Sequence, residues 1–303
     1  MPEVRVGDTP ARVLMASESR LSVEVPAGLA RGRYEVQVDG VEGAASLDVG
    51  APLVTGVHQV DSPAFGPDGT LYVTFSGTRG QRVPVSVFRV GPDGEKAPFL
   101  TGIANATSMA FDAGGALHVT SRLDGCVYRA DETGRLEVVA RELGTACGIA
   151  FGSDGTMFVG DRSGTVFRIG SASRVVPFAS LPPSLAAFHL AAGPADELFV
   201  TAPTMATRDG VYRIDRQGVV VKVADGFGRP QGMAVDAEGA LYVVDAVAGG
   251  AGLYRLRSGA RRELVLAAPA LVGAAFDPRG GLVVASNDTV YRLDVALRPW
   301  SFA

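Results

Sequence analysis

The sequence has few of the residues that build disulfide frameworks, zinc sites or membrane spans. It contains 2 cysteines, 3 histidines and 1 tryptophan in 303 residues. Two cysteines are too few for a disulfide framework, and no Cys or His pair has zinc-ligand spacing, so we expect Cys126 and Cys147 to be free, buried thiols. The N-terminus lacks a basic stretch followed by an apolar core, and no apolar run reaches the roughly 18 residues of a membrane span. These absences predict a cytoplasmic protein.

Strong charge and the common nucleotide motifs are also missing. Lys and Arg total 28 against 32 Asp and Glu, which gives a net charge of −4. Such a balance offers no basic field for nucleic acid or an anionic membrane, so we expect neither partner. No P-loop, no Ser-His-Asp order and no G-x-G-x-x-G between a strand and a helix occur, which leaves nucleotide chemistry and nucleophilic catalysis without support.

Glycine, by contrast, is abundant, and it recurs within a repeated unit. The chain has 39 glycines, which indicates many tight turns between short strands. One unit returns every 40–46 residues: PAFGPDGTLYV (63–73), MAFDAGGALHV (109–119), IAFGSDGTMFV (149–159), LAAGPADELFV (190–200), MAVDAEGALYV (233–243) and AAFDPRGGLVV (274–284).

A second signature follows each unit and combines apolar, aromatic, Arg and apolar residues. Its arginines are Arg89, Arg129, Arg168, Arg213, Arg255 and Arg292. A period of about 40 residues with four short strands is typical of a propeller blade, so the sequence predicts an all-β fold with a six-bladed β-propeller over residues 51–294. The last blade lacks its own fourth strand, and alignment of 51–65 with 262–276 places residues 52–57 there. The ring would then be closed by the N-terminal side of the chain.

Residues 1–50 lie outside the repeat and form short alternating segments separated by Gly, Pro and Asp-Gly turns. They predict a small β module. The phrase ESRLSVEVPAGLARGRYEVQV resembles the second half of an IPT/TIG immunoglobulin-like domain, which implies an immunoglobulin-like module. Residues 295–303 are left as a C-terminal tail.

Residues 52–294 resemble the NHL-repeat propellers, whose blade phrase P-x-G-(I/M)-A-(V/F)-D-x-x-G-x-L-Y-V-x-D is matched by Pro230–Asp245. They also resemble the six-bladed gluconolactonase and senescence-marker (regucalcin-like) family. That resemblance implies a divalent cation, calcium or zinc, held on the axis by oxygen ligands from residues before the innermost strands. The matching positions are Asp61, Thr107, Cys147, Phe188, Gln231 and Val272.

Asp61 and Gln231 are therefore the candidate metal ligands. Asp61 stands in a D-S-P phrase where the family has Glu, and Gln231 stands where the family has Asn. Cys147 and Phe188 stand at the third-blade and fourth-blade positions, where the family supplies oxygen donors. In the same interpretation, Asp161 or Asp245 is the candidate catalytic base.

In a propeller, the starts of the innermost strands and the loops after the second strands open on one face. Mixed carboxylate, guanidinium and amide groups that converge there predict a ligand site. The candidates are Asp61, Ser121, Arg122, Asp161, Arg162, His189, Gln231, Asp245, Asn287 and Asp288. The alternative is that Asp161 and Asp245 cap loops while the two arginines are solvated. Loops 75–84 and 202–210 would form the rim.

The repeated arginines favour a structural role, because a binding site is used once whereas a packing solution recurs in every blade. We expect their stems between blades and their heads paired locally or hydrated. His118 occupies a position held by Tyr, Phe or Val in the other repeats, which predicts a core residue.

Three functions are compatible with these patterns. The first is a binding module for a small molecule or a peptide at the axial mouth. The second is a divalent-metal-dependent lactone hydrolase of the gluconolactonase type. The third is a structural or adhesion scaffold that acts through the N-terminal module.

Overall fold

The computed structural model describes residues 2–170, 173–247, 250–257 and 262–293. Every regular element in these ranges is a β-strand, which confirms the predicted all-β class. Within the described ranges there is accordingly no helix that could cross a membrane. The C-terminal tail expected at 295–303 lies outside the described residues.

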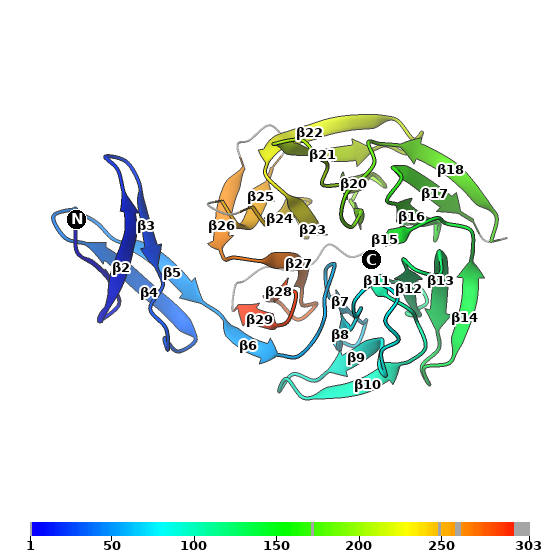
Figure 1. Ribbon diagram of the computed structural model, residues 1–303, viewed down its shortest axis with the longest axis horizontal. Coiled ribbons are helices and arrows are strands. Elements are labelled where there is room, and N and C mark those ends of the chain that lie inside the picture. The colour runs from blue at the N-terminus through cyan, green and yellow to red at the C-terminus, as the bar shows by residue number, and fades with distance from the viewer. Residues whose placement is uncertain (1, 171–172, 248–249, 258–261, 294–303) are drawn as a thin grey trace.

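Among the described residues, six four-stranded antiparallel sheets stand around a common axis as a β-propeller (Figure 1). From the axis outwards, the strands of the first three sheets are β7 (Ala64–Phe65), β8 (Leu71–Thr74), β9 (Val87–Val90), β10 (Lys96–Leu100); β11 (Ala106–Phe111), β12 (Leu117–Ser121), β13 (Cys126–Ala130), β14 (Leu136–Ala140); and β15 (Ala146–Phe151), β16 (Met157–Asp161), β17 (Thr165–Ile169), β18 (Val175–Ser180).

The remaining three sheets repeat the arrangement, except that the last takes its outer strand from the N-terminal side. Their strands are β19 (His189–Ala192), β20 (Leu198–Thr201), β21 (Asp209–Ile214), β22 (Val220–Phe227); β23 (Pro230–Val235), β24 (Leu241–Asp245), β25 (Gly252–Leu256), β26 (Glu263–Ala267); and β27 (Leu271–Phe276), β28 (Leu282–Ser286), β29 (Val290–Leu293), β6 (Ala51–Val54).

A short turn, which reads D-x-x-G in three of the six copies, forms the hairpin between each innermost strand and the second strand. In the fifth sheet, Asp236 Oδ1 accepts hydrogen bonds from the backbone amides of Glu238 at 3.0 Å and Ala240 at 2.9 Å. Gly239 adopts a φ of 80°, a left-handed conformation that glycine reaches without steric cost. The repeat therefore specifies its turns through one carboxylate and one glycine.

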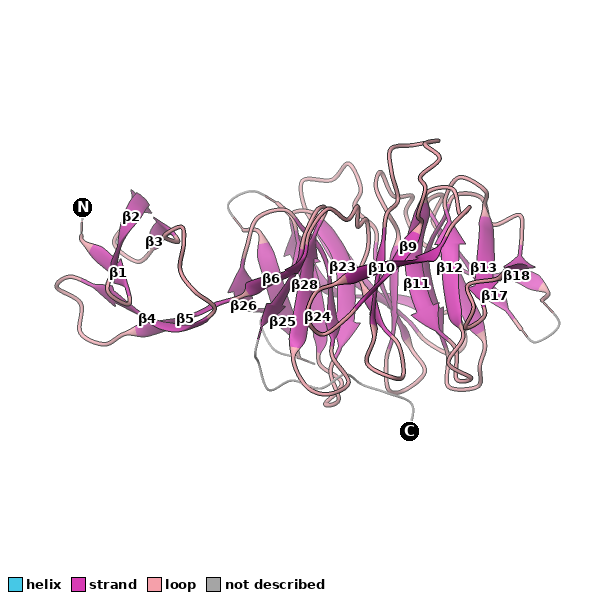
Figure 2. Cartoon of the chain, turned by 90° about the horizontal axis from the view of Figure 1, so that it is seen from below, coloured by secondary structure: helices cyan, strands magenta, loops and turns pink. Residues whose placement is uncertain are grey.

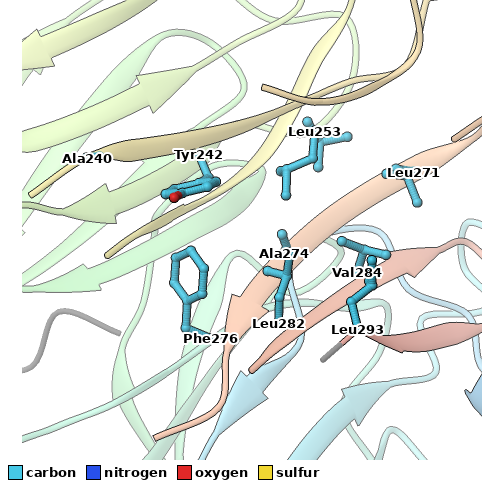
Figure 3. Close-up of a cluster of buried hydrophobic side chains, with 10 residues drawn as sticks. Ala240, Tyr242, Leu253, Leu271, Ala274, Phe276, Leu282, Val284 and Leu293 are labelled. Carbon is cyan, nitrogen blue, oxygen red and sulfur yellow. The ribbon is translucent and has the colours of Figure 1, made fainter. Parts of the chain in front are cut away.

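The sheets are held together by apolar clusters between neighbouring blades. Between the fifth and sixth sheets, the rings of Tyr242 and Phe276 meet edge to face with centroids 5.0 Å apart. Leu253, Leu271 and Leu282 complete this buried cluster (Figure 3). Because the second strands are covered on both faces, they read as nearly continuous apolar runs.

β6 pairs antiparallel with β29, with Val54 opposite Val290. It overlaps the stretch 52–57 that repeat alignment assigned to this place. Val54 and Val57 are buried in a cluster with Leu71 of the first sheet, so the segment packs against both ends of the ring.

Residues 2–50 form one five-stranded sheet beside the propeller (Figures 1 and 2). In the order β3-β2-β1-β4-β5, its strands are β3 (Leu21–Glu24), β2 (Thr9–Ala16), β1 (Val4–Val6), β4 (Gly32–Val38) and β5 (Ala45–Val49). Only Val4 and Val6 are buried in this segment. The module thus carries little core of its own.

The repeated arginines pair locally, as the sequence predicts. Arg292 contacts Asp277 at 2.5 Å, Arg255 lies 3.3 Å from Asp236, and the Arg89 guanidinium stacks 3.7 Å from the centroid of Phe99.

The predictions for His118 and the two cysteines are also confirmed. His118 is 5% exposed and packs edge to face on Phe151. Cys126 and Cys147 are free and buried.

The closing strand gives a stability test. Val54→Ala removes two buried methyl groups between the first and last sheets, and we expect it to lower the free energy of unfolding by about 2 kcal/mol. Val41→Ala is the matched control, because Val41 is 62% exposed in the N-terminal module; it should change stability by less than about 0.5 kcal/mol. Denaturant unfolding followed by circular dichroism measures both, and equal midpoints would contradict a closing role for β6.

Candidate functional site

The innermost strands are irregular where they begin, next to the axis. The ladder register shifts in four of them, β11, β15, β23 and β27. A β-bulge at such a point re-aims a side chain that would otherwise lie in the pleat. The residues within these irregular stretches include Thr107, Cys147, Gln231 and Val272, and all four line one cavity on the axis.

Glycines beside the bulges let neighbouring innermost strands approach closely. A Cβ on Gly148 would lie 2.5 Å from the Phe188 carbonyl oxygen, and one on Gly232 would lie 2.5 Å from Ser62 Oγ. The Gly148 amide instead donates a 2.5 Å hydrogen bond to Phe188 O, which ties the third sheet to the fourth. The axis is narrow because these positions carry no side chain.

Threonines of the second strands fix the bulged backbone of the next sheet. Thr120 Oγ1 donates to the Cys147 carbonyl oxygen at 2.5 Å, and Thr201 Oγ1 donates to the Gln231 carbonyl oxygen at 2.6 Å. Both threonines are fully buried. The positions of Cys147 and Gln231 around the axis are therefore set by hydrogen bonds between sheets.

The cavity at this end of the axis, which we call the mouth cavity, has a volume of about 260 Å³. It is lined by Gln59, Val60, Thr107, Arg122, Cys147, Arg162, Leu185, Ala186, Ala187, Gln231, Val272 and Asn287. Two guanidinium groups and three carboxamides thus face one small space.

A polar contact crosses the axis below the mouth cavity. Asp61 Oδ1 lies 2.7 Å from His189 Nδ1, and Ser108 Oγ donates to Asp61 Oδ2. These residues come from the first, fourth and second sheets, and His189 is fully buried. Asp61 and Ser108 each follow a residue of the mouth cavity and themselves line the opposite cavity. The contact therefore lies at the level where the mouth cavity gives way to the opposite cavity.

The opposite cavity, of about 290 Å³, is largely apolar. Apart from Asp61, Ser62 and Ser108, its lining comes from Pro63, Met109, Ala110, Ile149, Ala150, Phe151, Leu190, Ala191, Ala192, Met233, Ala234, Val235, Ala274, Ala275 and Phe276. The polar groups of the axis are therefore concentrated at the mouth.

Of the ten candidate residues from the sequence, four line the mouth cavity: Arg122, Arg162, Gln231 and Asn287. Asp61 lines the opposite cavity. Ser121 is buried and donates to the Ala104 carbonyl oxygen at 2.5 Å, and Asp288 is exposed beside Thr289.

The two candidate bases hold loops. Asp245 accepts from the amides of Gly228 at 2.9 Å and Arg229 at 2.8 Å, and Asp161 accepts from the amide of Thr145 at 2.7 Å. Neither carboxylate lines the mouth cavity. This is the loop-capping geometry that the sequence left open as the alternative.

Sequence reasoning missed three contributors to the mouth. Gln59, two residues before Asp61, is fully buried and accepts from the Thr74 amide at 2.8 Å through Oε1. The segment 185–187 arrives from the loop before β19. Arg79 is carried by loop 75–84, which Asn105 holds through a 2.8 Å hydrogen bond from its Nδ2 to Thr78 O. Asn105 has a φ of 47°, in the left-handed region, and this backbone conformation is visible in the structure but not in the sequence.

The mouth is electropositive. Burial lowers the pKa of Arg122, and the guanidinium groups of Arg162 and Arg79 lower it further, while Cys147 opposes them. No carboxylate is among the groups that bear on this arginine. Burial also raises the pKa of the Cys147 thiol to about 12, so this group is neutral at physiological pH.

The axial residues do not fit a divalent cation. No group of three or more His, Cys, Asp or Glu suited to a metal ion occurs in the described part of the chain. Asp61 is engaged by His189, Ser108 and the Ser62 amide, and the matching positions carry a protonated thiol, a phenyl ring and a valine. Calcium needs six or more oxygen ligands and a catalytic zinc ion needs three protein ligands, and Asp61 and Gln231 alone supply neither set.

The ring of four-stranded sheets with a polar cavity on its axis defines the chain as a β-propeller. A gluconolactonase from Xanthomonas campestris is 16% identical, with 97% of each chain covered and a TM-score of 0.68. Virginiamycin B lyase from Staphylococcus aureus is 15% identical, with 80% of this chain and 95% of that chain covered and a TM-score of 0.55.

An auxiliary nutrient binding protein from Bacteroides ovatus is 15% identical, with 96% of this chain and 90% of that chain covered and a TM-score of 0.63. No family model and no curated protein matches the sequence. At these identities the likeness shows the fold, which enzymes and a binding protein share.

The protonated state of Cys147 can be measured by alkylation. In Cys126→Ala, Cys147 is the remaining thiol, and a pKa of about 12 leaves about one molecule in ten thousand as thiolate at pH 8. We expect iodoacetamide to modify it far more slowly in the folded protein than in denaturant. Rapid modification of the native protein would contradict both the burial and the neutral charge assigned to this residue.

Proposed function

We propose that the chain is a six-bladed propeller with an N-terminal immunoglobulin-like module, and that it binds a small molecule in the mouth cavity. The observation that carries this proposal is the convergence of Arg122, Arg162, Gln231 and Asn287 on one space of about 260 Å³. A concave site with a few placed polar groups is typical of small-molecule recognition.

The build of the mouth favours binding by a preformed site. The bulged strands are fixed by threonine hydrogen bonds between sheets, and Arg162 Nη2 donates to Leu185 O at 2.6 Å, which ties the rim segment to the wall. Ser184 Oγ donates to Ala187 O and to Pro203 O, each at 3.0 Å. A site already ordered loses little entropy when a ligand enters.

The volume favours a small molecule over a peptide segment. A cavity of about 260 Å³ lies just below the range of roughly 300–1,000 Å³ that is usual for ligand pockets. An extended peptide would have to lie across the rim, where loop 75–84 stands on one side.

A fragment screen by ligand-observed NMR tests the proposal. Ala187→Phe places a ring in the mouth cavity, whereas Ala113→Phe places the same ring on an exposed turn at the other end of the propeller. We expect a set of fragments to bind the wild type and Ala113→Phe and to lose binding to Ala187→Phe by about tenfold or more. Fragments that bind all three proteins equally would locate the ligand site elsewhere and contradict the proposal.

A divalent-metal-dependent lactone hydrolase is the second candidate, and the gluconolactonase among the similar structures supports it. In that case Asp61 and Gln231 would hold the ion. Calorimetric titration with calcium, zinc and manganese, followed by a panel of lactones, separates the two functions. Stoichiometric metal binding that is lost in Asp61→Ala, together with lactone turnover, would favour the hydrolase.

A further inference from the structure

Three residues that line the mouth cavity carry buried hydrogen-bond donors without acceptors. Gln59 is fully buried, and its Nε2 has no hydrogen-bond partner among the described residues. The Nε atoms of Arg122 and Arg162 are buried without a partner in the same part of the chain. A buried donor left unpaired is unfavourable, so these groups together favour an occupant rich in acceptors.

The carboxylates that the sequence pattern places near the mouth do not neutralise Arg122 and Arg162. Asp161 and Asp245 are taken up by backbone amides, and Asp61 is held by His189 and Ser108. Burial and the two neighbouring guanidinium groups lower the pKa of Arg122, and no carboxylate is among the groups that act on it. Cations gathered in a concave, low-dielectric site raise the local concentration of anions.

Guanidinium groups match planar and tetrahedral oxyanions well. Their N–H groups form a fork that pairs with two oxygens of a carboxylate or a phosphate at once. Arg162 uses Nη2 to hold Leu185 O, which fixes its orientation and leaves Nε free. No acidic group contributes to the pKa shift of Arg122.

We infer that the mouth cavity recognises a small organic anion, whose carboxylate or phosphate group is bound by Arg122 and Arg162 with Gln59 Nε2 as a further donor. This inference rests on the proposed function, since it names the ligand class of the same site. The rest of the ligand lies against Leu185, Ala186, Ala187 and Val272, which line the same cavity.

The apolar part of the lining restricts the ligand further. Short side chains at 186 and 187 leave room for a flat or branched apolar body beside the charged group. A free inorganic anion would leave these side chains facing water, and a long polyanion would exceed the cavity. The preferred ligand is therefore compact, with one charged end and one apolar end.

Three ligands of the same size distinguish the chemistry: benzoate, phenyl phosphate and the uncharged benzamide. Titration calorimetry or chemical-shift mapping on the full chain should show binding of at least one anion, and benzamide should bind about tenfold more weakly or less. The preferred anion identifies carboxylate or phosphate as the recognised group. Raising the salt concentration should weaken anion binding and leave benzamide unchanged.

Arginine variants locate the binding. Arg122→Gln and Arg162→Gln should each lower the anion affinity by about tenfold or more. Arg129→Gln is the matched control, because it removes the same charge from an exposed arginine that lies 3.8 Å from Asp112; its affinity should stay within about twofold. Thermal unfolding of each variant verifies that the fold is intact.

The outcomes separate this inference from the proposed function. Benzamide binding as tightly as benzoate, with sensitivity to Ala187→Phe, would keep the mouth as a ligand site and overturn the anion inference. Anion binding unchanged in both Arg122→Gln and Arg162→Gln would also overturn it. Absence of binding by either anion up to about 20 mM would do the same, since one paired charge should bring the dissociation constant into the millimolar range. Fragments that bind Ala187→Phe as tightly as the wild type would contradict the proposed function itself.

Discussion

The close approach of the innermost strands around the axis is the constraint on which the rest of the propeller depends. It requires positions without a Cβ, and Gly148 and Gly232 provide them where neighbouring backbone or side-chain atoms would otherwise collide. Once the strands are this near, a threonine on one sheet reaches the bulged carbonyl group of the next. Packing between blades and the geometry of the mouth follow from the same contact, because the bulged residues point to the axis rather than into the pleat.

The lining of the axis is consequently polar at the mouth cavity and largely apolar at the opposite cavity. The Asp61, His189 and Ser108 contact occupies the level between the two cavities, with polar groups gathered on one side and apolar groups on the other. The same aspartate that a metal site would need is thereby committed to the protein. The mouth cavity is lined by hydrogen-bond donors, and an acceptor-rich ligand complements these donors better than a cation does.

The fold could be predicted from the repeat, because five of the six copies carry a turn aspartate and a turn glycine and all six carry an apolar second strand. The site was readable only in part. Arg122, Arg162, Gln231 and Asn287 follow from blade positions, so the pattern found them. Gln59 and Arg79 do not, since the first depends on a buried hydrogen bond to Thr74 and the second on a loop held by Asn105. Asp161 and Asp245 stand one residue before the blade position shared by Arg122, Arg162 and Asn287, and only their backbone partners show that they hold loops.

The strand that completes the ring has a consequence for how the chain is made. β6 is synthesised about 240 residues before its partner β29. Until β29 emerges from the ribosome, β6 has an unpaired edge of the kind that recruits foreign strands. One residue separates β5 from β6, so the N-terminal sheet stays covalently attached to this unpaired strand until β29 is made. β6 is thus translated before the other strands of the ring and is among the last of them to be paired.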